Sequence, residues 1–298
     1  MRSDRQTISR AGMCYLLFLI VVQGVQIGAM LLFPFFASGG WGLWLLAAVP
    51  MYAAGLPALL LLGRALLPHG GAPARGAALS PARWAAWFVV VLGATYLLNF
   101  LSVGITSLLA LLKGRAVANP LALMTGGGEL LPTLLFGCVV AGLGEEFIFR
   151  KLLYRYIGGL GARTYIWLGG LIFGLFHLNL SQFFYAFALG ALFCAIYAKT
   201  GCIWYTVALH IAVNLCGMVL LPGLAVSGSE VLAAVSVGII FVAIAAGTVL
   251  FFRLRKTIAP APPAEQDAHP VRAALTSPGT LLYILTCAAI IGVVTFLS

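Results

Sequence analysis

The sequence has little charge, and this absence narrows the class of protein that it can encode. Only 8% of its 298 residues are Asp, Glu, Lys or Arg, whereas 62% are hydrophobic. An average soluble domain is about 25% charged and about half apolar, and a disordered chain is more polar still. The composition therefore excludes both classes and predicts a polytopic membrane protein.

Motifs for covalent and metal chemistry are also missing. The sequence contains no Gly-x-Ser-x-Gly motif, no His-Glu-x-x-His motif and no Cys-x-x-Cys pair. Without a serine constellation, catalysis by a covalent nucleophile is disfavoured. The six cysteines all lie in apolar stretches, where we expect small packing residues rather than metal ligands or disulfides. They are Cys14, Cys138, Cys194, Cys202, Cys216 and Cys287.

Long apolar stretches divide the chain into candidate membrane spans of about 20 residues each. They cover residues 11–36, 41–63, 84–112, 130–157, 165–180, 183–198, 202–221, 231–252 and 281–297. We expect a single all-α membrane domain, 1–298, with about nine spans, eight being also compatible. The loops 64–83 and 257–279 are rich in Pro, Gly or Ala, and the second is expected to tether an accessory last helix within 253–298.

The basic residues indicate how the spans are oriented. Of the 17 Lys and Arg residues, only Lys113 and Arg115 fall on the outer side when the N-terminus is placed in the cytoplasm. Such a bias follows the positive-inside rule. The net charge of +10 therefore reports membrane orientation and not a nucleic-acid partner. We expect an integral membrane protein, in the inner membrane of a bacterium, whose lipid partner is the bilayer.

Six polar residues lie within the spans, where such side chains are costly and by default mark a functional site. His69 and His269, by contrast, lie in the two long loops and are expected to be solvated. The six are Glu145, Glu146 and Arg150 in the fourth span, His177 in the fifth, and His210 and Asn214 in the seventh.

Depth in the membrane indicates that these residues can meet. Glu145 and His177 each lie 13 residues from the turn near 158–164, or about 20 Å at helical rise. Residues four apart share a helix face, so Glu146 is expected to pair with Arg150. Adjacent carboxylates point about 100° apart, so we do not expect both to face one cavity squarely. Glu145 is then left for chemistry.

The residues also resemble a known family. Glu145 to Arg150 match Glu-Glu-x-x-x-Arg, Phe173 to His177 match Phe-x-x-x-His, and His210 to Asn214 match His-x-x-x-Asn. In this order within apolar helices, they resemble the three motifs of the CPBP family of intramembrane proteases. That family includes type II CAAX prenyl endopeptidases and bacteriocin-processing or self-immunity proteins. The resemblance implies a catalytic core in spans four to seven, over residues 130–221.

The resemblance implies a glutamate-type hydrolase with two groups of site residues. Glu145 and His177 would activate a water, while His210 and Asn214 would stabilise the oxyanion. The supporting residues would be Glu146, Arg150 and Phe173. The chemistry agrees, because hydrolysis of an amide needs a base, a water and donors to the oxyanion.

Other readings stay open. No cofactor is expected, but zinc at His177, His210 and Glu145 is the nearest mechanistic alternative, because two histidines and a glutamate form a familiar catalytic zinc set. A non-catalytic membrane scaffold or an immunity-type protein could keep the same constellation, and a proton-relay transporter is a weaker option. The expected partner of the enzyme is a membrane-anchored protein or peptide, cleaved near its C-terminus or its anchor.

The side on which the site opens bears on the substrate. With the N-terminus inside, His177 precedes the outer turn 179–182 by two residues, and Asn214 lies about 12 Å from the outer loop near Pro222. We therefore expect an outward-facing site that trims exported proteins. Glu145 fits less well, since about 15 residues separate it from the outer start of its helix. A cytoplasm-facing CAAX prenyl protease is the alternative.

Overall fold

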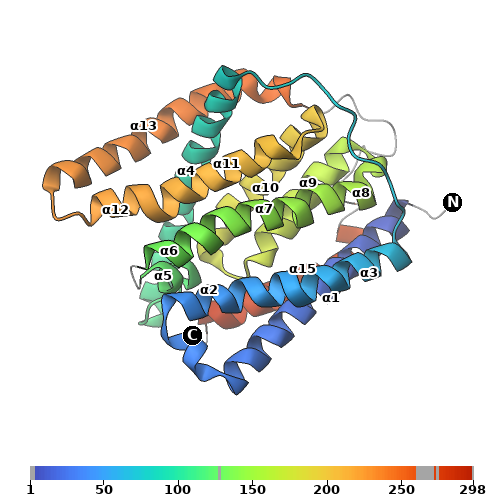
Figure 1. Cartoon of the computed structure of the whole chain (residues 1–298), viewed down its shortest axis with the longest axis horizontal. Coiled ribbons are helices and arrows are strands. Elements are labelled where there is room, and N and C mark those ends of the chain that lie inside the picture. The colour runs from blue at the N-terminus through green and yellow to red at the C-terminus, as the bar shows by residue number, and fades with distance from the viewer. Residues whose placement is uncertain (1–3, 127–128, 260–271, 273–274, 297–298) are drawn as a thin grey trace.

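The chain folds into a bundle of helices (Figure 1). The computed structural model describes residues 4–126, 129–259, 272 and 275–296. No strand occurs among these residues, and eight of their helices are long and apolar enough to span a membrane. The predicted all-α polytopic bundle is therefore confirmed.

The first four spans are α1 (Asp4–Leu32), a helix composed of α2 (Gly40–Val49) and α3 (Leu56–Leu66), the helix α4 (Pro81–Lys113), and a helix that contains α6 (Leu130–Pro132), α7 (Ala141–Glu146) and α8 (Leu153–Ile157). The other four are α10 (Leu180–Thr200), a helix composed of α11 (Ile203–Leu215) and α12 (Leu221–Ala225), the helix α13 (Glu230–Leu254), and α15 (Pro278–Phe296). The short helix α5 (Pro120–Thr125) follows α4.

Several spans contain π-helical segments, in which the turns are wider than in an α-helix. Such segments are rare and are frequently found at functional sites. Two of them, Thr133–Val140 and Phe147–Leu152, flank α7 on either side. The others are Pro50–Gly55, between α2 and α3, and Cys216–Leu220, between α11 and α12.

The fifth predicted span is a helix that begins and ends earlier in the chain than expected. Helix α9 covers Ala162–Phe176, whereas the sequence predicted a span over 165–180. Its 15 residues extend about 22 Å, less than the roughly 30 Å of a hydrocarbon core. The helix ends early because Asn179 caps α10, its Oδ1 accepting a hydrogen bond from the Gln182 backbone N–H at 2.9 Å. The described residues therefore form eight helices long enough to span a membrane and one shorter apolar helix, where about nine spans, or eight, were predicted.

Two hydrophobic clusters form the core. One joins residues of α1, α3, α8, α9 and α15, and the other joins residues of α4, α10, α11 and α13. Helix α9 packs along α10, and α11 packs against α7 (Figure 1). The polar residues singled out in the sequence lie where α7, α9 and α11 meet, between the two clusters.

The last helix packs closely against the first. A Cβ atom added to Gly279 would lie 1.9 Å from the Ser9 carbonyl oxygen, so only glycine allows this approach. The Thr280 hydroxyl donates to the Ile8 carbonyl at 3.1 Å, and the buried Tyr283 hydroxyl donates to the Ile172 carbonyl of α9 at 2.8 Å. Helix α15 thus supports α1 and α9. The linker that was predicted to tether it lies largely outside the described residues.

The loop between α3 and α4 crosses the ends of other helices. The Gly70 N–H donates to the Arg155 carbonyl at 2.9 Å, and the Gly76 N–H donates to the Thr200 carbonyl at 3.1 Å. His69 in this loop is exposed, in keeping with the expectation of a solvated side chain. His269 lies outside the described residues.

Candidate active site

Helix α7 presents two adjacent carboxylates to different surroundings. The Glu145 side chain is 19% exposed, whereas the Glu146 side chain is fully buried. Both lie in the six-residue α-helical stretch between the two π-helical segments of this span. Glu145 is therefore the carboxylate that a substrate or a water can reach.

Arg150 pairs with Glu146 as the spacing predicts. Its Nη1 atom lies 3.2 Å from Glu146 Oε1, and both side chains are fully buried. The guanidinium carbon also lies 4.1 Å from the centroid of the Phe173 ring and 5.2 Å from that of Phe193. An aromatic face attracts a cation, and more strongly when water is excluded. A carboxylate and two rings, one from each hydrophobic cluster, thus compensate the buried charge.

His210 contacts both carboxylates, which the sequence did not predict. Its Nδ1 atom lies 2.8 Å from Glu146 Oε1, and its Nε2 atom lies 3.8 Å from Glu145 Oε2. The two glutamates point in different directions, as expected, yet one imidazole reaches them with opposite edges of its ring. The sequence led us to expect Glu145 at the cavity and Glu146 paired with Arg150. That expectation did not include His210, which connects the two glutamates.

The hydrogen bond to Glu146 also determines what His210 can donate. A carboxylate accepts, so His210 Nδ1 carries the proton of this bond. In a neutral imidazole the other nitrogen is then unprotonated. His210 can therefore donate from Nε2 only when the ring carries both protons.

His177 lies at the end of α9, as its C-terminal cap residue. Its Nδ1 atom lies 2.9 Å from the Phe173 carbonyl oxygen, and the Phe173 ring packs edge-on against the imidazole with centroids 4.9 Å apart. The next residue, Leu178, has φ of 55° and is the non-glycine residue with positive φ in the described chain. Such strain costs on the order of 1–3 kcal/mol and clusters at functional sites.

Phe173 connects the two histidines of the site. Its ring centroid lies 6.1 Å from that of His210 in addition to the contact with His177. His210 in turn lies within 3.8 Å of the Glu145 carboxylate. The structure thus links His177 to Glu145 through Phe173 and His210.

Asn214 lies one helical turn beyond His210 and contacts another part of the fourth span. Its Nδ2 atom donates a hydrogen bond to the Gly137 carbonyl at 2.9 Å. An amide has two N–H donors and a carbonyl acceptor, so one donor stays for a further partner. Gly137 lies in the π-helical segment before α7, so this bond also joins α11 to the helix of the carboxylates.

Two residues that the sequence interpretation did not include also lie at the site. Phe193 of α10 covers the second face of Arg150, and its centroid lies 5.8 Å from that of His210. Tyr52, in the π-helical segment between α2 and α3, reaches α7 from outside the three motifs. The sequence signal that could have identified Tyr52 is a hydroxyl within an apolar span. Phe193 has no such signal, because it is one of many aromatic residues in α10.

The arrangement of the site side chains bears on whether they could bind a metal ion. Among the described residues, no three His, Cys, Asp or Glu side chains are grouped so as to hold a metal ion. His210 Nδ1 is bonded to Glu146, which leaves only Nε2 of that ring to face Glu145.

Comparison with known proteins identifies the region that contains these residues. Residues 127–216 match the family model described as type II CAAX prenyl endopeptidase Rce1-like. They include all the residues of the three motifs and overlap the predicted core, 130–221.

A curated relative matches part of the chain. The chain is 30% identical over 105 residues to the "Putative membrane peptidase YdiL" of Bacillus subtilis (strain 168), a stretch that covers 34% of this chain and 42% of that protein. No solved structure matches. The resemblance read from the three motifs is confirmed over residues 127–216, which are similar to the type II CAAX prenyl endopeptidases of the Rce1-like family.

Proposed function

We propose that this protein is an intramembrane endopeptidase of the glutamate type. It hydrolyses a peptide bond near the C-terminus or the membrane anchor of a membrane-associated protein. The observation that supports this best is the partly exposed Glu145 carboxylate, whose Oε2 atom lies 3.8 Å from His210 Nε2 within a buried polar cluster. The family match over the same residues supports the activity independently.

In the proposed mechanism, Glu145 and His177 activate a water. One of them takes a proton as the water oxygen bonds to the scissile carbonyl carbon, and the carbonyl oxygen becomes an oxyanion. His177 suits this role because a carbonyl accepts the hydrogen bond of its Nδ1–H, which leaves Nε2 of the neutral ring as an acceptor. When the oxyanion collapses, the C–N bond breaks and the leaving amine takes the proton.

The oxyanion is stabilised from α11. The second N–H of the Asn214 amide is one donor. His210 is the other, and it acts as the doubly protonated ring, because its Nδ1–H is used by Glu146. Glu146 and Arg150 support the site by compensating each other's charge and by holding His210. Preorganised donors of this kind are usually the largest contribution to acyl-transfer catalysis.

The substrate depends on which side the site opens. Helix α9 begins beside the basic residues Arg155 and Arg163 and ends at His177, about 22 Å away at helical rise. With a cytoplasmic N-terminus, His177 then lies nearer the outer leaflet, which favours the anchor or sorting segment of an exported protein. The similarity to type II CAAX prenyl endopeptidases instead favours a prenylated C-terminus that enters from the cytoplasm.

Mass spectrometry of membrane-protein C-termini tests the proposal. Cells that carry the native chain are compared with cells that carry Glu145→Gln. We expect a small set of membrane-associated proteins to keep longer C-termini or uncleaved anchors in the variant. The matched control is Glu129→Gln, because this exposed glutamate precedes the same span and its side chain accepts a hydrogen bond from the Trp41 N–H, away from the site. Identical termini in native and Glu145→Gln cells, at equal protein abundance, would contradict an endopeptidase and favour a scaffold.

A further inference from the structure

The two π-helical segments beside α7 receive hydrogen bonds from side chains of other helices. The Asn214 amide and the Tyr52 hydroxyl donate to carbonyls of the first segment, those of Gly137 at 2.9 Å and Val140 at 3.2 Å. In the second segment, the Tyr15 hydroxyl donates to the Ile148 carbonyl at 2.7 Å, and the Tyr165 hydroxyl donates to the Arg150 carbonyl at 3.1 Å.

This pattern follows from the geometry of a π-helix. A shift from i−4 to i−5 bonding disturbs the regular use of backbone carbonyls. In the apolar interior of a membrane protein, such carbonyls are satisfied by neighbouring helices, because an unpaired backbone group costs several kcal/mol there. The four donors therefore stabilise the irregular turns that flank Glu145 and Glu146.

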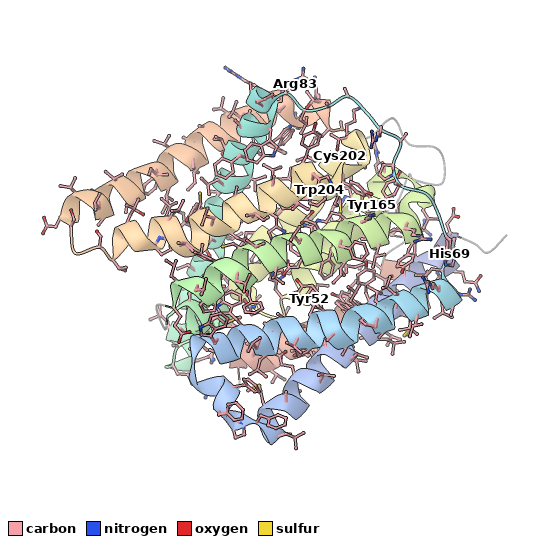
Figure 2. The ribbon with its side chains drawn as sticks, viewed as in Figure 1. Tyr52, His69, Arg83, Tyr165, Cys202 and Trp204 are labelled. Carbon is pink, nitrogen blue, oxygen red and sulfur yellow. The ribbon has the colours of Figure 1, made fainter. Side chains whose placement is uncertain are left out.

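Tyr52 also contacts α7 itself, beside the proposed reactive carboxylate. Its hydroxyl bonds Val140, which lies one residue before α7 begins, and its ring lies on the backbone of Gly144. A Cβ atom added to Gly144 would lie 2.2 Å from Tyr52 Cε1, so the ring touches the residue directly before Glu145. Figure 2 shows Tyr52 between the second span and α7.

Tyr52 also lies outside the matched region, 127–216, so no family motif assigns it a role. The second span reaches the site through Tyr52, since this side chain contacts Val140, directly before α7, by its hydroxyl and Gly144, within α7, by its ring.

We propose that Tyr52 is a positioning residue of this site: by binding the Val140 carbonyl and packing on Gly144, it sets where α7 places the Glu145 carboxylate relative to His210. Tyr52 acts through the backbone and needs no contact with the substrate. This inference rests on the proposed function for its catalytic consequence, whereas the positioning itself can be measured without any turnover.

The first arm of the test measures the position of side chain 145 directly. Glu145→Cys is introduced into the full chain, reconstituted in lipid nanodiscs, with the six native cysteines replaced by alanine. The rate of alkylation at position 145 by a small uncharged maleimide is then compared in three backgrounds: Tyr52, Tyr52→Phe and Tyr205→Phe. Tyr205 is the matched control, since its hydroxyl accepts a hydrogen bond from the Leu79 N–H in the loop before α4, away from α7.

We expect Tyr52→Phe to change the alkylation rate at least threefold and Tyr205→Phe to leave it unchanged. The phenylalanine ring keeps the contact with Gly144, so the protein should remain folded, and its thermal unfolding midpoint is measured alongside. Equal rates for Tyr52 and Tyr52→Phe would overturn the proposal.

The second arm measures turnover in the chain with Glu145 intact. The probes are two quenched peptides, one ending in a farnesylated Cys-aliphatic-aliphatic-Met sequence and one with an unmodified hydrophobic anchor. We expect Tyr52→Phe to lower kcat about tenfold with KM within twofold of the native value, because the base is misplaced while the substrate still binds. An unchanged kcat would overturn the catalytic part of the inference.

The two arms also separate this inference from the proposed function. If the native chain cleaves neither probe while Tyr52→Phe changes the alkylation rate, the positioning role is supported and hydrolysis of these two peptide classes is contradicted. If the native chain cleaves a probe while Tyr52→Phe changes neither alkylation nor turnover, the hydrolase is supported and the positioning role is wrong.

Discussion

The Nδ1 atom of His177 lies 2.9 Å from the carbonyl oxygen of Phe173, four residues earlier at the end of the same helix. Since a carbonyl only accepts, this contact sets the tautomer of the neutral ring and leaves Nε2 without a proton. A core histidine bonded to a neighbouring carbonyl would show the same contact. The Phe173 ring, which contacts both His177 and His210, and the strained Leu178 favour the proposed role of His177 over that of a packing residue.

Loss of either proposed base should abolish turnover without loss of protein. We expect Glu145→Gln and His177→Ala each to lower processing about 10²–10⁴-fold, the range of general acid–base catalysis. Abundance should stay at the native level, because neither change leaves a buried charge unpaired. Product peptides and membrane abundance are measured by quantitative mass spectrometry, with Glu129→Gln as the control. Turnover like that of the native chain in either variant would exclude that residue as a base.

Removal of Arg150 should reduce the amount of folded protein as well as its activity. Arg150→Ala removes the guanidinium from the fully buried Glu146 and leaves it with His210. Loss of one partner of a buried ion pair costs about 3–5 kcal/mol in soluble proteins. The measurement is the thermal unfolding midpoint in detergent together with the abundance in membranes. Arg155→Ala, at the exposed end of the same span, is the matched control and should be stable.

The Arg150 experiment also has a reciprocal variant. In Arg150→Met/Glu146→Gln no buried charge stays unpaired, so abundance should recover while activity remains low. If Arg150→Ala accumulates normally and loses only turnover, the guanidinium belongs to the chemistry and not to the support of the site.

Close packing of α15 on α1 should be sensitive to one methyl group. In Gly279→Ala, the new Cβ atom would lie 1.9 Å from the Ser9 carbonyl oxygen, a backbone atom that cannot rotate away. We expect a destabilisation of about 1–3 kcal/mol, as in other overpacked interfaces. Gly292→Ala in the same helix meets nothing within 4 Å and serves as the control. Equal unfolding midpoints for the two variants would show that α1 and α15 accommodate the added methyl group without loss of stability.

Chelation tests the zinc alternative. We expect purified protein to keep its turnover after prolonged treatment with a strong chelator, and elemental analysis to find no stoichiometric zinc. Glu145, His177 and His210 would be the ligands if this expectation is wrong. In that case, zinc added back should restore activity to the native chain and fail to restore it to His210→Ala.

Labelling of single cysteines tests the orientation. In a chain without native cysteines, Gly159→Cys should react with an impermeant maleimide added to the cytoplasmic side. Val226 is 81% exposed, and Val226→Cys should react with the maleimide added outside. Ser181→Cys reports the side from which the site is reached, and we expect labelling from outside. Labelling of position 181 from the cytoplasm alone would support the CAAX-type substrate instead.

The sequence was sufficient for features that depend on local spacing. The prediction of a span over 84–112 corresponds to α4 at Pro81–Lys113, because apolar length alone determines such a helix. The pairing of Glu146 with Arg150 likewise follows from residues four apart on one face, and the structure has it at 3.2 Å.

Other features depend on how helices face one another and could not be read in this way. The contact of His210 with both glutamates depends on the rotation of α11 against α7, which periodicity does not specify. The π-helical segments leave no signature in a pattern of 3.6 residues, so neither the bond from Asn214 to Gly137 nor the one from Tyr52 to Val140 was expected. Helix α9 ends at Phe176, before the predicted end at residue 180, because the Asn179 side chain caps the start of the next helix.

The pairing of α1 with α15 has a consequence for how this protein is made. The Arg5 side chain donates to the Thr276 carbonyl, a partner 271 residues further along the chain. During synthesis, the first helix enters the membrane long before that partner has been translated, so the face of α1 around Gly12 must meet lipid or an insertion factor in the meantime. Packing of α1 against α15 therefore waits until the chain has been synthesised through residue 296.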